Sequence, residues 1–189
     1  MNLLGNGLSA ANHDEEALSL KETELALMLR LGDSESNILV MQGNLANSYE
    51  MLGRDEEALP IRRDVYSVTL KIFGISHEGT LREASNYAST LKDLKHFDEA
   101  KSLLQKTMPV ARRVLGEGHD LTLTLRWIYA EALYSDHGAT LDNLREAATT
   151  LEETERTARR VLGSAHPTTE SLNEELQLAR AALRARESS

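Results

Sequence analysis

The sequence predicts an all-α protein, a solenoid in which antiparallel helix pairs stack one after another. Three observations lead to this fold class. Glycines recur at a fixed spacing, apolar residues recur at helical steps within each unit, and only three prolines interrupt 189 residues. The repeat carries the most weight, because self-similarity at a period of roughly 20–50 residues is the sequence signature of solenoids.

The repeat is marked by its closing glycine. Gly32, Gly74 and Gly116 lie 42 residues apart, and Gly163 follows after 47. A Glu-Ala pair recurs in each copy, about 15 residues before the glycine. We therefore expect one array over residues 1–189, with repeats at about 1–33, 34–75, 76–117 and 118–164 and a capping helix over 166–187.

Each repeat is predicted to contain two helices. In the second repeat, apolar residues at steps of three and four form one stripe, from Ile38 to Leu52. Gly53 then suits a left-handed turn, and a second helix is expected over 55–73. The last predicted helix has Gln177 where the third repeat has Ala88, and a polar last helix is what the end of a solenoid needs.

Two repeats depart from this pattern. The first begins at Met1, inside what would be its first helix, so we expect the chain to be a fragment of a longer protein. The fourth has five extra residues between Leu133 and Ala147, which we place in the turn between its two helices.

Composition excludes several classes of function. The formal net charge is −9, and duplex binding needs a basic patch, so we expect no nucleic-acid partner. No stretch approaches the roughly 18 apolar residues of a membrane span, so we expect no membrane partner. There is no cysteine, which excludes disulfides and thiolate metal sites and fits a cytoplasmic protein.

Catalytic motifs are also absent. The sequence has no phosphate-binding loop, no His-Glu-x-x-His zinc motif and no Gly-x-Ser-x-Gly nucleophile motif. His77, His119 and His166 close successive repeats, too far apart to share a metal, and we expect them to cap or brace the following turn. The prediction is a protein that is not an enzyme and that uses no cofactor and no metal.

These residues resemble the tetratricopeptide repeat, and more narrowly the 42-residue version of kinesin light chains. The resemblance rests on the Asn44-Leu45-Ala46 segment, the turn at Gly53, the Glu-Ala pairs and the closing Gly-x-x-His, which begins at Gly74, Gly116 and Gly163. It covers nearly the whole chain. It implies a right-handed superhelix whose concave face is lined by the first helix of each repeat.

The resemblance also implies where a partner would bind. The family's groove positions fall on this sequence at a set of mostly polar residues, of which we select Asn6, Asn44, Asn47, Arg82, Asn86, Ser89, Trp127 and Glu131. Asn44 and Asn86 occupy the family's characteristic groove asparagine. An amide offers donors and an acceptor, so it can hold the backbone of an extended peptide.

The role of Trp127 stays open, and we do not expect the groove to capture a free C-terminus. Trp127 is either an aromatic anchor for a partner or a packing residue against a neighbouring helix. Arg82 is the only clear cation among the groove positions, so the set that clamps a free C-terminal carboxylate in some relatives is missing.

The predicted function is a scaffold module that binds a protein or an extended peptide segment in the concave groove. One alternative is a structural module that self-associates through the ends of the array. Another is the ligand-sensing repeat region of a larger signalling ATPase of the NB-ARC class, because that class carries similar arrays.

Overall fold

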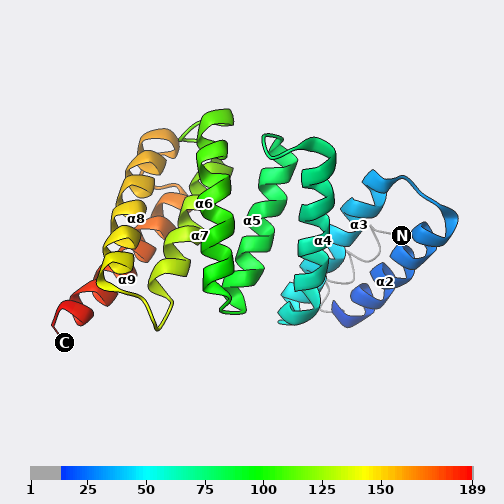
Figure 1. The fold of residues 1–189 in the computed structure, drawn as a ribbon, viewed down its shortest axis with the longest axis horizontal. Coiled ribbons are helices and arrows are strands. Elements are labelled where there is room, and N and C mark those ends of the chain that lie inside the picture. The colour runs from blue at the N-terminus through cyan, green and yellow to red at the C-terminus, as the bar shows by residue number, and fades with distance from the viewer. Residues whose placement is uncertain (1–13, 189) are drawn as a thin grey trace. The chain divides into compact units, whose positions relative to one another are not determined.

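The computed structural model describes residues 14–188, and all regular structure in this range is α-helical. Figure 1 shows the helices as ribbons in chain order. Their bounds are α2 Asp14–Leu31, α3 Glu35–Met51, α4 Asp55–Phe73, α5 Glu78–Asp93, α6 Phe97–Val114, α7 Asp120–Tyr134, α8 Leu141–Leu162 and α9 Pro167–Glu187. The predicted all-α solenoid of helix pairs is confirmed.

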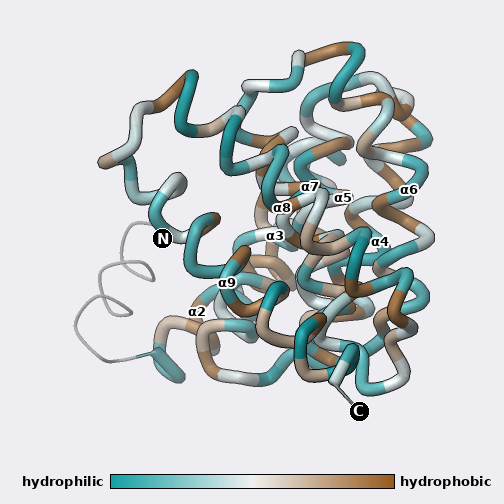
Figure 2. Tube along the Cα trace, turned by 90° about the vertical axis from the view of Figure 1, so that its left-hand side faces the viewer, coloured by the Kyte–Doolittle hydropathy of each residue, from teal (hydrophilic) through white to brown (hydrophobic). Residues whose placement is uncertain are grey.

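The chain forms two compact units, which we describe separately. Of the described residues, the first unit holds 14–69 and the second unit holds 70–188. Helix α4 begins in the first unit and ends in the second. Figure 2 shows hydrophilic and hydrophobic residues interspersed along the helices, which therefore have apolar residues to bury.

Helix ends fall where the local sequence predicts them. Helix α4 has the predicted bounds, and Gly53, which precedes it, has a φ of 69°. That left-handed conformation is open to glycine because it has no Cβ to clash with the backbone. One repeat later the same position is Lys95, with a φ of 63°, and it is the only non-glycine with positive φ among the described residues.

The three Gly-x-x-His histidines cap the helices that follow them, α5, α7 and α9, as predicted. The imidazole Nδ1 of His77 accepts a hydrogen bond from the N–H of Gly79 at 3.1 Å. His119 and His166 accept equivalent bonds from Leu121 at 3.2 Å and Thr168 at 3.3 Å. Each histidine therefore satisfies one of the amide groups that a helix start leaves without an intrahelical partner.

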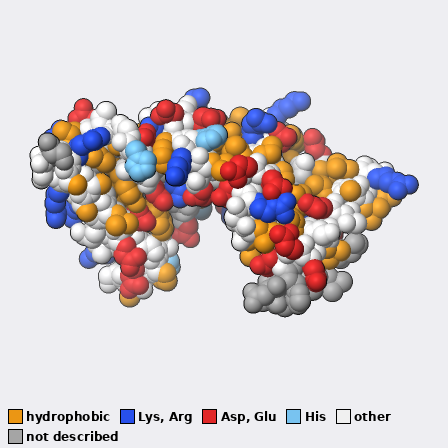
Figure 3. Space-filling view, turned by 90° about the horizontal axis from the view of Figure 1, so that it is seen from below, with side chains coloured by type: hydrophobic (Ala, Val, Ile, Leu, Met, Phe, Trp, Pro, Cys, Tyr) orange, Lys and Arg blue, Asp and Glu red, His pale blue; other side chains and the backbone are white. Residues whose placement is uncertain are grey.

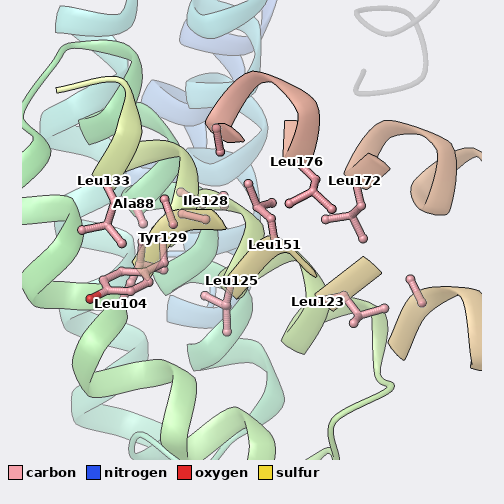
Figure 4. Packing of buried hydrophobic residues seen from close by; sticks show 14 of the residues in the cluster. Ala88, Leu104, Leu123, Leu125, Ile128, Tyr129, Leu133, Leu151, Leu172 and Leu176 are labelled. Carbon is pink, nitrogen blue, oxygen red and sulfur yellow. The ribbon is translucent and has the colours of Figure 1, made fainter. Parts of the chain in front are cut away.

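The second unit has two layers of helices. In one layer α5 contacts α7 and α7 contacts α9, and we call these three helices the inner layer. Helices α6 and α8 form the other layer, where α6 packs on α5 and α7, and α8 packs on α7 and α9. The core between them is built of buried leucine and alanine with Ile128 and Tyr129, several of which are drawn in Figure 4.

The five extra residues of the fourth repeat are divided between a turn and a helix. The turn between α7 and α8 covers residues 135–140, whereas the turn between α5 and α6 covers only 94–96. Helix α8 also starts earlier than α6 relative to the matching alanine, and it is capped by Thr140, whose hydroxyl accepts from the N–H of Asn143. The insertion therefore lengthens α8 as well as the turn that was expected to hold it.

Helix α9 differs from α5 and α7 on one face. The buried residues of α5 include the apolar Leu81, Ala84, Ala88 and Leu91. In α9 the same repeat positions are Glu170, Asn173, Gln177 and Arg180. A polar face of this kind needs no covering helix, and the capping role of α9 stays a prediction.

Candidate functional site

Five of the predicted groove residues lie on the inner layer of the second unit. Arg82, Asn86 and Ser89 are on α5, and Trp127 and Glu131 are on α7. Because α5, α7 and α9 contact one another in turn, side chains at equivalent positions of these helices lie on one layer.

Asn86 is half-buried on α5 and has hydrogen-bonding capacity to spare. Its amide Nδ2 donates to Glu83 at 3.3 Å. Its Oδ1 has no hydrogen bond among the described residues, although an amide can donate two bonds and accept two. Ser89, one turn further along, is also half-buried, and its hydroxyl has no hydrogen bond in the described part of the chain.

Two other groove residues already hold partners within the protein. Arg82 is exposed and pairs with Glu78 at 2.6 Å. Glu131 accepts from the ammonium of Lys92 at 2.8 Å, and this ion pair joins α7 to α5. Burial would lower the pKa of Lys92, but hydrogen bonds to Glu131 and Asp93 outweigh it and raise that pKa. Glu131 therefore serves the packing of the inner layer.

Trp127 is half-buried and packs against the core of the second unit. Its indole Nε1 is covered by protein atoms and has no hydrogen-bond partner in the described residues. A buried donor without a partner costs free energy, so this N–H would gain from any acceptor that reached it. The sequence left open whether Trp127 binds a partner or packs against a neighbouring helix. In the structure its side chain packs against the core of the second unit.

Two predicted groove residues lie in the first unit, on α3. The side chain of Asn44 is half-buried, and no hydrogen bond is found for its amide among residues 14–188. Asn47 accepts a short hydrogen bond from the guanidinium of Arg62 on α4, so its oxygen is engaged within the protein. Asn6 lies outside the described residues.

The structure also reveals a pair of contacts that sequence reasoning missed. Lys92 on α5 and Tyr134 on α7 lie 42 residues apart, at the same repeat position. Each donates to a carboxylate on the next inner helix, Lys92 to Glu131 and Tyr134 to Glu175. Burial and the bond to Glu175 both raise the pKa of the Tyr134 hydroxyl. The 42-residue spacing was the available signal, but it says nothing of which partner each side chain meets.

A cavity of about 200 Å³ opens on the other layer, between α6 and α8. Its main polar groups are engaged within the protein. Arg126 pairs with Glu153 at 2.8 Å, and the hydroxyl of Tyr129 donates to Glu146 at 2.8 Å. Unlike Asn86 on the inner layer, these groups offer little unused hydrogen-bonding capacity to a ligand.

Two other kinds of feature are absent from the described residues. Within residues 14–188, no group of three or more histidine or carboxylate side chains could hold a metal ion. None of the described helices is both long enough and apolar enough to cross a membrane. On the face drawn in Figure 3, acidic and basic side chains are interspersed.

Comparison with known proteins gave one family and several structures. The tetratricopeptide-repeat family model matches residues 38–78 and 81–120. No curated protein sequence matches the chain. A candidate kinesin light chain of Podosopora anserina, with nearly identical tetratricopeptide-like repeats, has a similar fold. A single-substitution variant of it is 22% identical, with a TM-score of 0.83, over 99% of this chain and 86% of that one.

Two further structures agree with this result. The same fungal protein without the substitution gives a TM-score of 0.80 at 22% identity, over 99% of this chain and 87% of that one. BtubC (BKLC) from P. vanneervenii gives a TM-score of 0.63 at 15% identity, over 96% of this chain and 78% of that one. Residues 38–78 and 81–120 therefore match tetratricopeptide repeats, and the chain has the fold of kinesin light chain-like repeats.

Proposed function

We propose that this array is a scaffold that binds an extended segment of another protein along the first helix of each repeat. Tetratricopeptide arrays are in general protein-interaction scaffolds without catalytic activity. The finer proposal concerns the residues that make the contact. We assign the backbone of the partner to the amides of Asn44 on α3 and Asn86 on α5, each within its own unit.

The observation that carries this proposal is a difference among the groove asparagines. The amide oxygen of Asn47 accepts a hydrogen bond from the buried Arg62, so Asn47 is engaged within the first unit. Asn44 and Asn86 occupy the same position of successive repeats, and both keep unused donors or acceptors. Each hydrogen bond to a peptide backbone would contribute about 0.5–1.5 kcal/mol net.

Neighbouring side chains of the second unit would add selectivity. Ser89 has a half-buried hydroxyl next to Asn86 along α5, and the ring of Trp127 on α7 is half-buried. Arg82 and Glu131 would contribute less, because a partner would have to compete with Glu78 and Lys92 for them. We therefore rank Asn44 and Asn86 first and Arg82 and Glu131 last.

The test compares Asn86→Ala and Asn44→Ala with a matched control, Asn173→Ala. Asn173 is an exposed asparagine on α9, at a position that faces away from the core. Proteins retained from a native lysate by the immobilised array would be identified by mass spectrometry and their dissociation constants measured. We expect the same protein to be lost by Asn86→Ala and by Asn44→Ala but kept by Asn173→Ala.

Thermal unfolding decides whether a loss of binding reflects a binding residue. Both test variants should melt within a few degrees of the parent, since neither amide has an essential partner within the described chain. If binding is lost together with a large drop in melting temperature, the asparagines are structural. If all three variants bind equally, the proposed contact is wrong.

A further inference from the structure

The last two turns of α2 are apolar around the whole helix. Six of the seven residues in 25–31 are Leu, Met or Ala, and only Arg30 is charged. The equivalent turns of α6 and α8 end in Arg112-Arg113 and Arg159-Arg160 on an exposed side. A helix that is hydrophobic all round is normally buried all round, so α2 carries more apolar surface than its own unit covers.

Much of this surface is open to solvent. Leu27, Leu29 and Leu31 are 43%, 55% and 74% exposed, and Val40 on α3 is 62% exposed. Helix α3 packs on α2, and only residues 32–34 separate the two helices, so Val40 lies at the same end of the hairpin. We call residues 25–31 of α2 and 38–40 of α3 the hairpin tip. Apolar patches of this kind mark interaction sites.

The rim of the hairpin tip carries one basic and one acidic residue, so the rims of two copies have complementary charges. Arg30 lies between Leu29 and Leu31, and Glu35 begins α3. Both are exposed, and neither has an ion-pair partner among the described residues. In a pair of copies related by a two-fold axis, Arg30 of each copy can meet Glu35 of the other, and the apolar residues face one another.

Helix α9 does not offer such a surface. The outer face of α9 carries Glu170, Asn173, Gln177 and Arg184, with Leu178 as its one exposed large apolar residue in the described range. A head-to-tail contact would bury leucines against these polar groups, which is unfavourable. Contact between two hairpin tips buries apolar surface on both sides and closes after two copies.

We propose that the hairpin tip is an interface at which two copies of this chain form a closed dimer. This goes beyond the proposed binding of a partner protein, because it uses a different surface. The dimer would hold two binding arrays together. A bivalent partner would then bind more tightly than one array allows, without any new contact to it.

Light scattering after size exclusion, over a wide dilution series, tests the dimer. The parent should approach twice its 21.0 kDa at high concentration and return to it on dilution. Leu29→Glu should stay at the monomer mass at every concentration. Leu178→Glu is the control, because Leu178 on α9 is exposed by the same 55% as Leu29, and it should dimerise like the parent.

Two further measurements keep the result decisive. Circular dichroism should give equal helicity for Leu29→Glu and Leu178→Glu. If Leu29→Glu unfolds, Arg30→Glu replaces it, because the charge of this exposed side chain can be reversed without disturbing the fold. Arg30→Glu should weaken the dimer, and adding Glu35→Arg should restore it. A parent that is monomeric throughout, or a dimer lost only in Leu178→Glu, would overturn the proposal.

Discussion

The two units fill the same core position with opposite chemistry. Four residues after the alanine of the recurring Glu-Ala pair, the first unit has Lys21 on α2 and Arg62 on α4. The second unit has Leu104 on α6 and Leu151 on α8. All four are almost fully buried, the cations at 5% and 3% and the leucines at 0%. The repeat fixes the position of this side chain but not its polarity.

The difference follows from what each side chain meets. The ammonium of Lys21 donates to the hydroxyl of Ser48 at 2.5 Å, and burial lowers its pKa. Arg62 donates to Glu50 at 2.9 Å and also to Asn47. On the helix that follows Leu104, the repeat equivalent of Ser48 is Ala132, which is buried and cannot accept a hydrogen bond through its side chain. An aliphatic side chain fits this core position in both units. A hydrogen-bond partner nearby decides whether that side chain can end in a charged group.

Exchanging these side chains should give the largest effect. Leu104→Lys places an ammonium in the second unit without a partner, and we expect it to cost more than about 4 kcal/mol of unfolding free energy. Adding Ala132→Ser supplies the hydroxyl that Lys21 has, and should recover about 1 kcal/mol. Denaturant unfolding of the two single variants and the double variant measures this coupling.

The reverse exchange is the control. Lys21→Leu gives the first unit the residue of the second and should be neutral or stabilising by up to about 1 kcal/mol, because a buried charge is replaced by a packed apolar group. A strong loss of stability in Lys21→Leu would show that the buried cation is essential to the first unit. The comparison would then need another explanation.

A smaller effect is expected where the two units agree. Ala46 on α3 and Ala88 on α5 occupy the same repeat position and are both fully buried. Ala46→Leu and Ala88→Leu should each cost about 1–3 kcal/mol, because added methylene groups overfill a closely packed contact. Unfolding midpoints measure the cost, with Ala181→Leu on the exposed side of α9 as the control. Unchanged midpoints would mean that the register is wrong.

Alkaline pH should weaken both units. Burial, followed by the bond to Glu146, raises the pKa of Tyr129, and burial with the bond to Glu175 raises that of Tyr134. In the first unit the hydrogen bond to Glu22 is the main cause that raises the pKa of Tyr49, to about 12. A folded pKa above the unfolded value of about 10 means that these groups contribute stability below pH 10, which is lost as the pH rises further.

Melting temperatures measured between about pH 8 and about pH 12 check this expectation. Tyr134→Phe cannot ionise, so its melting temperature should fall less steeply over that range than the parent's, although it starts lower for lack of the bond to Glu175. A parallel fall in both proteins would remove Tyr134 from the explanation.

The smallest expected effect concerns a turn. Lys95 has a φ of 63° where the preceding repeat has Gly53, and a Cβ is disfavoured in that conformation. Lys95→Gly should stabilise the protein by about 0.5–1 kcal/mol, since relief of the strain exceeds the extra entropy of a glycine. Gly53→Lys should destabilise by a similar amount. Equal and opposite changes in the unfolding midpoint would confirm that the two turns are equivalent.

Much of the fold could be predicted from local signals. The bounds of α4, the turn at Gly53 and the histidine caps all depend on a few neighbouring residues, whose preferences act over one turn of helix. The insertion before Ala147 was placed in a turn, but part of it lengthens α8. Whether extra residues join a helix depends on a cap such as Thr140, which the spacing of the repeat does not encode.

The candidate site was less accessible to sequence reasoning. The register of the repeat placed Arg82, Asn86 and Trp127 on the inner helices, which is a matter of helical periodicity. It did not tell that Asn47 would be engaged by Arg62, or Glu131 by Lys92. These contacts join residues on different helices, so they depend on how the helices pack.

The sequence by itself determined the helix pairs, their period and the position of each buried side chain, because these depend on spacing along the chain. Only the tertiary structure decided which buried cation has a partner, which groove amides remain unused and which leucines of α2 stay exposed. The reason is physical. Helix formation is governed by neighbours in sequence, whereas hydrogen bonding and burial are completed by residues of another helix.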